Sequence, residues 1–154
     1  MVVDTVEERR DSIRRAATMS AIVGPMVALM LVGFLARLQN FFCPANFLPL
    51  YAVSFVLLAP GFFLIGLSGA EAALRLGEHG MTWLQSLLIL AGAGGVLGVL
   101  YFESLTFVLI RVLPGYAPLF DMPGLRLALA LAAGLAATWN LVVGRSERQI
   151  LSLR

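Results

Sequence analysis

The sequence predicts an all-α membrane protein with four transmembrane helices and a short N-terminal helix at the membrane interface or in the cytoplasm. Of the 154 residues, 60% are hydrophobic and 13% are charged, whereas soluble domains have about 45–50% apolar and about 25% charged residues. The apolar residues fall into four long stretches. Because a helix needs about 20 apolar residues to cross a hydrocarbon core of about 30 Å, four crossings leave no room for a soluble catalytic domain.

The first 15 residues are polar and have the spacing of a helix that starts in water. Asp4 and Glu7 fit a capping box, and Asp11 lies three and four residues before Arg14 and Arg15, which supports a helix face. The apolar stretch that follows is long enough to span, and no small-residue cleavage site stands out after it. We therefore expect residues 1–15 to form a cytoplasmic segment and residues 16–143 to form the transmembrane domain.

The first two spans each contain a proline. The first is predicted over residues 16–36, with Pro25 inside it, and stops at Arg37. The second is predicted over residues 48–70 and contains Pro60 followed by Gly61. This pair should kink the helix unless a neighbouring helix satisfies the carbonyl group that the proline frees.

The third apolar stretch, residues 81–113, is longer than one perpendicular crossing needs. Either it tilts strongly, or its end leaves the membrane as an interfacial piece. After a turn-rich segment around Asp121, the last span is predicted over residues 125–143, and residues 144–154 form a charged cytoplasmic tail. Tyr101, Trp83 and Trp139 fall near predicted span ends, where we expect them to anchor in the headgroup zone.

The distribution of arginine predicts the orientation in the membrane. All eleven basic residues are arginine, and cytoplasmic loops carry the excess of such residues. The prediction is a multi-pass protein of a bacterial inner membrane with both termini in the cytoplasm. Eight arginines fall on the cytoplasmic side (Arg9, Arg10, Arg14, Arg15, Arg75, Arg145, Arg148, Arg154) and three on the other (Arg37, Arg111, Arg126).

Glu103 is the one acidic residue inside a predicted span. An ionisable group within a membrane is by default a functional hypothesis, because its burial in lipid is costly. It either binds a coupling ion or proton, or it lies near the outer headgroups or pairs with Arg111 or Arg126. Its position late in the third stretch favours the second interpretation.

Small residues mark a close helix contact in the third span. In the run AGAGGVLG, residues 91–98, Gly94 and Gly98 have the small-xxx-small spacing that lets two helix backbones approach. The contact is either within this chain or with a partner, and the sequence leaves both open.

The sequence contains no recognisable arrangement for catalysis or for a cofactor. We find no nucleophile with its base, phosphate-binding loop or facing carboxylates, so we expect a protein that is not an enzyme and has no cofactor or metal. Cys43 is the only cysteine and His79 the only histidine, which excludes an internal disulfide and a bis-His haem. We expect lipids as partners, with Arg145 near headgroup phosphates, and no nucleic acid.

The segment GAEAALRLGEH, residues 69–79, resembles the small membrane subunit (DctQ-like, Q subunit) of tripartite ATP-independent periplasmic (TRAP) transporters. The matching positions are Gly69, Ala70, Arg75, Gly77 and His79, and Pro118, Pro123 and Gly134 are similar to that family's entry into its fourth span. The resemblance implies a non-catalytic subunit that scaffolds a larger, polytopic, ion-coupled transport subunit. It also implies a periplasmic solute-binding protein as a further partner.

Two other classes stay open. The final span, with Pro118, Trp139, Asn140 and Arg145, also looks like that of GtrA-like flippases of polyprenyl-phosphate-linked sugars. The second class is an accessory subunit of another membrane complex. We take Gly69, Arg75, His79, Gly94, Gly98 and Glu103 as the candidate partner-contact or functional residues.

Overall fold

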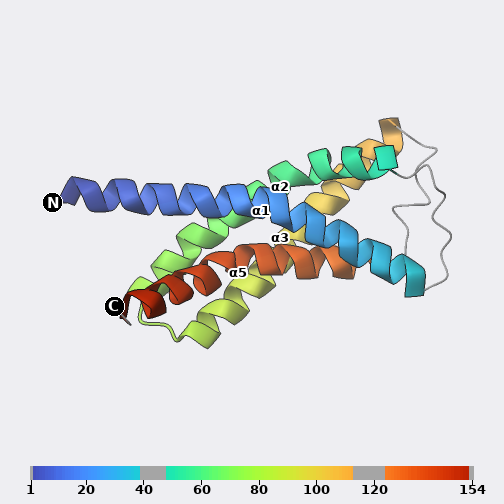
Figure 1. Ribbon diagram of the computed structural model, residues 1–154. Coiled ribbons are helices and arrows are strands. Elements are labelled where there is room, and N and C mark those ends of the chain that lie inside the picture. Colours follow the sequence, from blue (N-terminus) through green and yellow to red (C-terminus); the bar gives the residue numbers. More distant parts are fainter. Residues whose placement is uncertain (1, 39–47, 113–123, 153–154) are drawn as a thin grey trace.

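Four helices make up almost all of the described chain in the computed structural model, which describes residues 2–38, 48–112 and 124–152 (Figure 1). The prediction of an all-α protein is confirmed for these residues. The helices are α1 (Val2–Leu38), α2 (Leu48–Glu78), α3 (Trp83–Val112) and α5 (Leu125–Ser152).

The first helix differs from the sequence prediction. A separate short N-terminal helix was expected over residues 1–15, but α1 is continuous from Val2 to Leu38 and contains Pro25. Between the charged turn and the apolar part stand Ala16 and Ala17. Alanine has the highest helix propensity, so nothing ends the helix there, and the Thr18 hydroxyl donates to the Arg14 carbonyl across this junction at 2.8 Å.

Three of the helices are long and apolar enough to cross a bilayer. Their candidate spans are Arg10–Phe34, Ala52–Leu76 and Trp83–Val112, and α5 contributes a shorter apolar stretch, Leu125–Trp139, among the residues described. The chain is therefore a multi-pass membrane protein, and the fourth crossing stays a prediction. The third stretch, for which one helix or a helix plus a separate piece was open, forms a single helix from Trp83 to Val112.

The helices form a bundle in which α5 contacts each of the other three. Helix α1 packs on α2 and α5, and α3 packs on α5 and α2. The beginning of α1, the end of α5 and the turn between α2 and α3 lie at the same end of the bundle (Figure 1). We call this end the turn end and the other the distal end.

The turn between α2 and α3 is defined by two capping motifs. Gly80 has a φ of 69°, and the Met81 N–H donates to the Leu76 carbonyl at 3.3 Å, as in a Schellman motif. Thr82 and Gln85 then form a capping box: the Thr82 N–H donates to Gln85 Oε1 at 3.1 Å, and the Gln85 N–H donates to Thr82 Oγ1 at 3.4 Å. The chain thus reverses direction between two capped helix ends.

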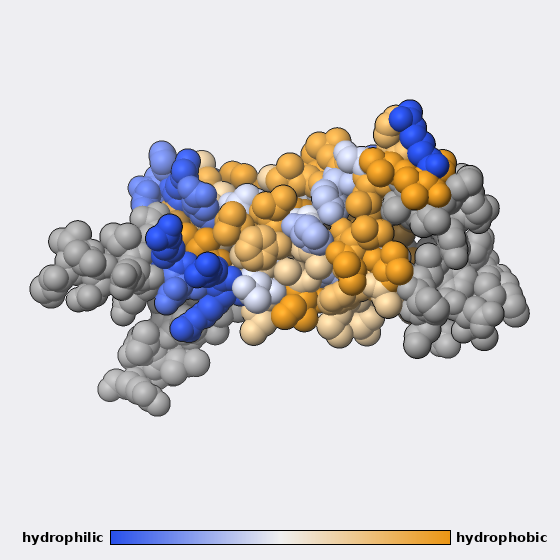
Figure 2. All heavy atoms as spheres, turned by 90° about the horizontal axis from the view of Figure 1, so that it is seen from above, coloured by the Kyte–Doolittle hydropathy of each residue, from blue (hydrophilic) through white to orange (hydrophobic). Residues whose placement is uncertain are grey.

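Apolar side chains cover the middle of the bundle, whereas charged residues gather at the turn end (Figure 2). On α1, large exposed side chains recur every three or four residues and form a stripe; on α5 they recur every four. The α1 stripe is Met19, Ile22, Met26, Met30 and Phe34, and the α5 stripe is Leu127, Leu131, Leu135 and Trp139.

Candidate functional site

The best-defined feature of the structure is a region of small residues where the four helices cross. In α2, a Cβ atom added at Gly66 would lie 2.4 Å from the Ser20 side chain of α1. A Cβ atom at Gly69 would lie 2.6 Å from the carbonyl oxygen and 2.8 Å from the Cα atom of Ala137 in α5. Gly69, one of the candidate residues, is therefore a site of backbone contact between α2 and α5.

The candidate glycines of α3 lie at its contact with α5. A Cβ atom at Gly94 would be 2.5 Å from the Ala137 Cβ atom, and one at Gly98 would be 2.3 Å from the Ala133 Cβ atom. From the opposite side, a Cβ atom at Gly134 would be 2.8 Å from the Ala91 carbonyl oxygen. The close contact at Gly94 and Gly98 is thus within this chain, which is one of the two alternatives left open by the sequence.

Two hydrogen bonds join helices at this crossing. The buried Ser20 hydroxyl of α1 donates to the Ala136 carbonyl of α5 at 3.3 Å. The Tyr101 hydroxyl of α3 donates to the Leu57 carbonyl of α2 at 2.7 Å. Such bonds between helices matter in a membrane because lipid chains offer no alternative partner.

Tyr101 was expected to anchor in the headgroup zone, and here the structure differs. Its ring packs against Gly61, where a Cβ atom would lie 2.4 Å from the ring, and its hydroxyl reaches the helix turn before Pro60. A proline has no N–H and disturbs the hydrogen bonds of the preceding turn, so a donor from a neighbouring helix stabilises carbonyl groups there. The Pro60-Gly61 pair was the signal that could have predicted this contact.

Glu103 forms an ion pair with Arg126, near the distal end of the bundle. Arg126 Nε donates a hydrogen bond to Glu103 Oε1, which links α3 to the first turn of α5. Arg111, the other partner considered, lies over the ring of Phe107 at 4.1 Å from its centroid. The pairing of Glu103 is therefore between helices.

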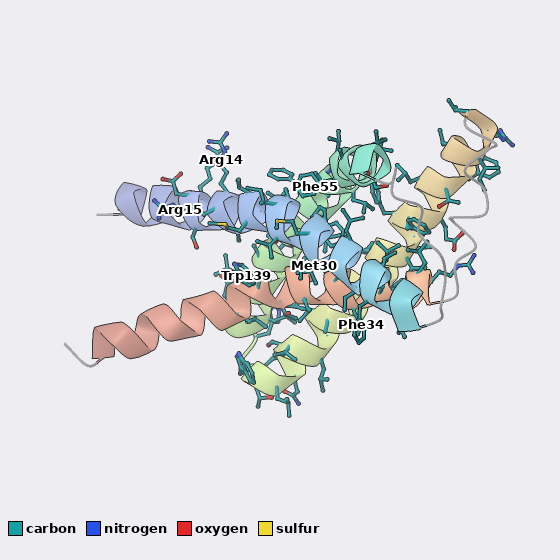
Figure 3. All side chains as sticks on the ribbon, turned by 45° about the vertical axis from the view of Figure 1, so that its right-hand side comes forward. Arg14, Arg15, Met30, Phe34, Phe55 and Trp139 are labelled. Atoms are coloured by element: carbon teal, nitrogen blue, oxygen red, sulfur yellow. The ribbon has the colours of Figure 1, made fainter. Side chains whose placement is uncertain are left out.

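Arg75 and His79 lie at the end of α2, at the turn end of the bundle. Arg75 donates a hydrogen bond to Glu71 one turn earlier at 2.6 Å, and His79 Nδ1 lies 2.7 Å from the Arg75 carbonyl oxygen. These side chains are exposed, so Arg75 and His79 are joined to their own helix. On α1, Arg14 projects away from the bundle at the same end (Figure 3).

The candidate residues do not converge on one centre. Gly69, Gly94 and Gly98 lie in the crossing, whereas Arg75 and His79 lie at the turn end and Glu103 lies towards the distal end. Among the residues described, no three His, Cys, Asp or Glu side chains are grouped as a metal site would need. Cys43, Asp121 and the side chains of Gly77, Asn140 and Arg145 lie outside the described part.

Comparison of the chain with known protein families, with characterised proteins and with solved structures gives no match. The functional proposal therefore depends on the helix packing and on the sequence motifs already described.

Proposed function

We propose that the chain is a non-catalytic, small integral-membrane subunit that scaffolds a larger ion-coupled transport subunit of the TRAP type. The observation that carries the proposal is the close contact of helix backbones at the crossing, which fills the centre of the described bundle with small side chains. Gly69 and Gly94 meet Ala137 from two sides. A solute path through the centre of this chain would have to separate these helices.

The buried side chains of the described bundle support a structural role. The core contains Leu58, Phe62, Leu129 and a group of alanines on α5. Two buried hydroxyl groups donate to backbone carbonyls: Ser20 to Ala136 and Thr138 to Gly134. These polar groups hold helices and helix turns together.

The outer surface supports assembly with a membrane partner. Met30 and Phe34 of α1 are 71% and 60% exposed, and Leu135 of α5 is 60% exposed; Figure 3 shows Met30 and Phe34 on α1 and Trp139 on α5. These stripes offer surface to lipid or to another membrane helix. With both helix termini at one end, the arginine distribution places that end in the cytoplasm.

The TRAP-type assignment is supported by the residues on the second span and its cytoplasmic end: Gly69 and Ala70, followed by Arg75, Gly77 and His79. It names a large polytopic transport subunit as the direct partner and a periplasmic solute-binding protein as the source of solute. The GtrA-like flippase and the accessory subunit of another complex become outcomes of the experiment.

The test is co-expression of the tagged full chain with the products of its neighbouring genes, followed by purification in dodecyl maltoside. We expect a large polytopic subunit to co-purify in a fixed ratio, and we expect liposomes with both subunits and the secreted binding protein to accumulate solute in response to an ion gradient. Liposomes with this chain alone should be inactive. Movement of a fluorescent polyprenyl-phosphate-linked sugar by this chain alone would refute the scaffold role and favour the flippase.

A further inference from the structure

The ion pair between Glu103 and Arg126 faces outward. The side chain of Glu103 is 43% exposed and that of Arg126 is 67% exposed. The pair joins two helices, and it does so on the surface of the bundle. Whatever surrounds the bundle therefore contacts a carboxylate and a guanidinium group.

The position of the pair along the bundle follows from the bond between Ser20 and Ala136, which places those two residues at one level. From Ala136 to Arg126, α5 rises by about 15 Å, whereas α1 rises by about 21 Å from Ser20 to Phe34. Phe34 is still apolar and 60% exposed. The apolar surface of α1 thus extends more than one helix turn beyond the pair.

Helix α3 leads to the same position. Phe107 and Val108, which follow Glu103 by about one turn, are 60% and 58% exposed, and the helix continues to Val112. Exposed apolar side chains therefore lie beyond the pair as well as before it. An ion pair at this depth lies within the apolar layer, below the level of the headgroups.

Lipid chains cannot hydrogen-bond a charged pair, and charged groups at membrane depth face protein or water. We propose that the face of α3 and α5 around this pair is the docking surface for a transmembrane helix of the larger transport subunit, which presents a hydrogen-bonding side chain to the pair. This inference rests on the proposed function. It adds the surface and the chemistry of the contact.

Gly92 supports a protein helix as the occupant of this face. It lies eleven residues before Glu103, which is about three turns of helix, so both residues are on one face of α3, and Val96 lies between them. A Cβ atom at Gly92 would meet nothing within 4 Å. An exposed glycine beside a hydrogen-bonding group is the combination that lets another membrane helix approach closely. We call Gly92, Val96, Glu103 and Arg126 the outer α3/α5 face.

The experiment uses the full chain, co-expressed with the large polytopic subunit encoded beside its gene. A photoreactive p-benzoylphenylalanine replaces Val96 in one variant and Met26, on the exposed stripe of α1, in the control variant. We expect an adduct with the summed mass of the two subunits from position 96 and none from position 26. We also expect Gly92→Leu to lower the amount of co-purified partner at least fivefold, and Gly92→Ala to leave it unchanged.

The outcomes are separable. An adduct from position 26 and not from 96 would overturn this docking surface and leave the scaffold function intact, whereas failure of the unmodified chain to co-purify would overturn both. An adduct of twice the mass of this chain, or adducts with phospholipid only, would assign the face to a second copy or to lipid and overturn the inference. The circular dichroism spectrum of the Gly92→Leu variant must match that of the unmodified chain, since its side chain enters open space; loss of helix would overturn the assignment of Gly92 to an outer face.

Discussion

Replacement of Gly69 by alanine should destabilise the chain more than any other single methyl group added to α2. The three atoms nearest to the added Cβ atom are the oxygen, Cα and carbonyl carbon atoms of Ala137, at 2.6, 2.8 and 3.1 Å. All three belong to the backbone of α5, so no side-chain rotation relieves the contact. Helix α2 or α5 has to move.

The size of the effect follows from this movement. Carbon atoms pack best at about 3.5–4.0 Å, so the contact with the Ala137 Cα atom requires a separation of about 0.7 Å or more. A gap of about 0.5–1 Å already removes a quarter to a half of the dispersion energy of the neighbouring contacts. Overpacking of this kind costs about 1–3 kcal/mol, and the hydrogen bond between Ser20 and Ala136, one residue before Ala137, is strained by the same shift.

The assay is unfolding of the purified chain in dodecyl maltoside micelles by added sodium dodecyl sulfate, followed by circular dichroism at 222 nm. Gly92→Ala is the matched control, because both substitutions change helix propensity equally and the added Cβ atom at Gly92 meets nothing within 4 Å. We expect the free energy of unfolding to fall by about 1–3 kcal/mol in Gly69→Ala relative to Gly92→Ala. Equal stability of the two variants would refute the close approach of α2 and α5.

Three further changes test other parts of the structure. Tyr101→Phe removes the donor to the Leu57 carbonyl and should lower the free energy of unfolding by about 1 kcal/mol in the same titration; an unchanged midpoint would contradict a role for this bond. Thr82→Ala removes the N-cap of α3 and should cost about 1 kcal/mol, with faster amide hydrogen exchange confined to the first turn of α3; exchange at the control rate there would count against the cap. Cys43, the only thiol, should react with a membrane-impermeant maleimide added outside intact cells, and reaction only after the inner face is opened would reverse the orientation.

The arrangement of helices could be predicted from composition because four apolar stretches separated by polar or Pro-rich segments have few alternatives in a bilayer. The helix limits were less accessible. No residue type marks the boundary between a charged and an apolar part of one helix, and the charged turns before Ala16 therefore joined the first span in a single helix. Hydropathy reports where a helix enters lipid, whereas helix propensity and capping decide where it begins.

The candidate residues were predicted with different success for a related reason. A small-residue motif indicates that helices touch, and Gly94 and Gly98 do lie against α5. The partner of Glu103 was narrowed to two arginines, and the structure has Arg126 in that position. The contact between Tyr101 and the turn before Pro60 was missed, because pairing across helices depends on rotation and crossing angle, which one sequence does not specify.

The run AGAGGVLG illustrates what that missing rotation means for function. Gly94 and Gly98 lie against α5, whereas Gly92, two residues before Gly94, has open space beside it. A leucine at Gly94 would force apart two helices of this chain and would lower co-purification of any partner by unfolding the chain itself. A leucine at Gly92 leaves the fold and blocks only what approaches from outside. Loss of assembly therefore identifies a partner surface only at Gly92, and the two neighbouring glycines separate folding from assembly in one helix turn.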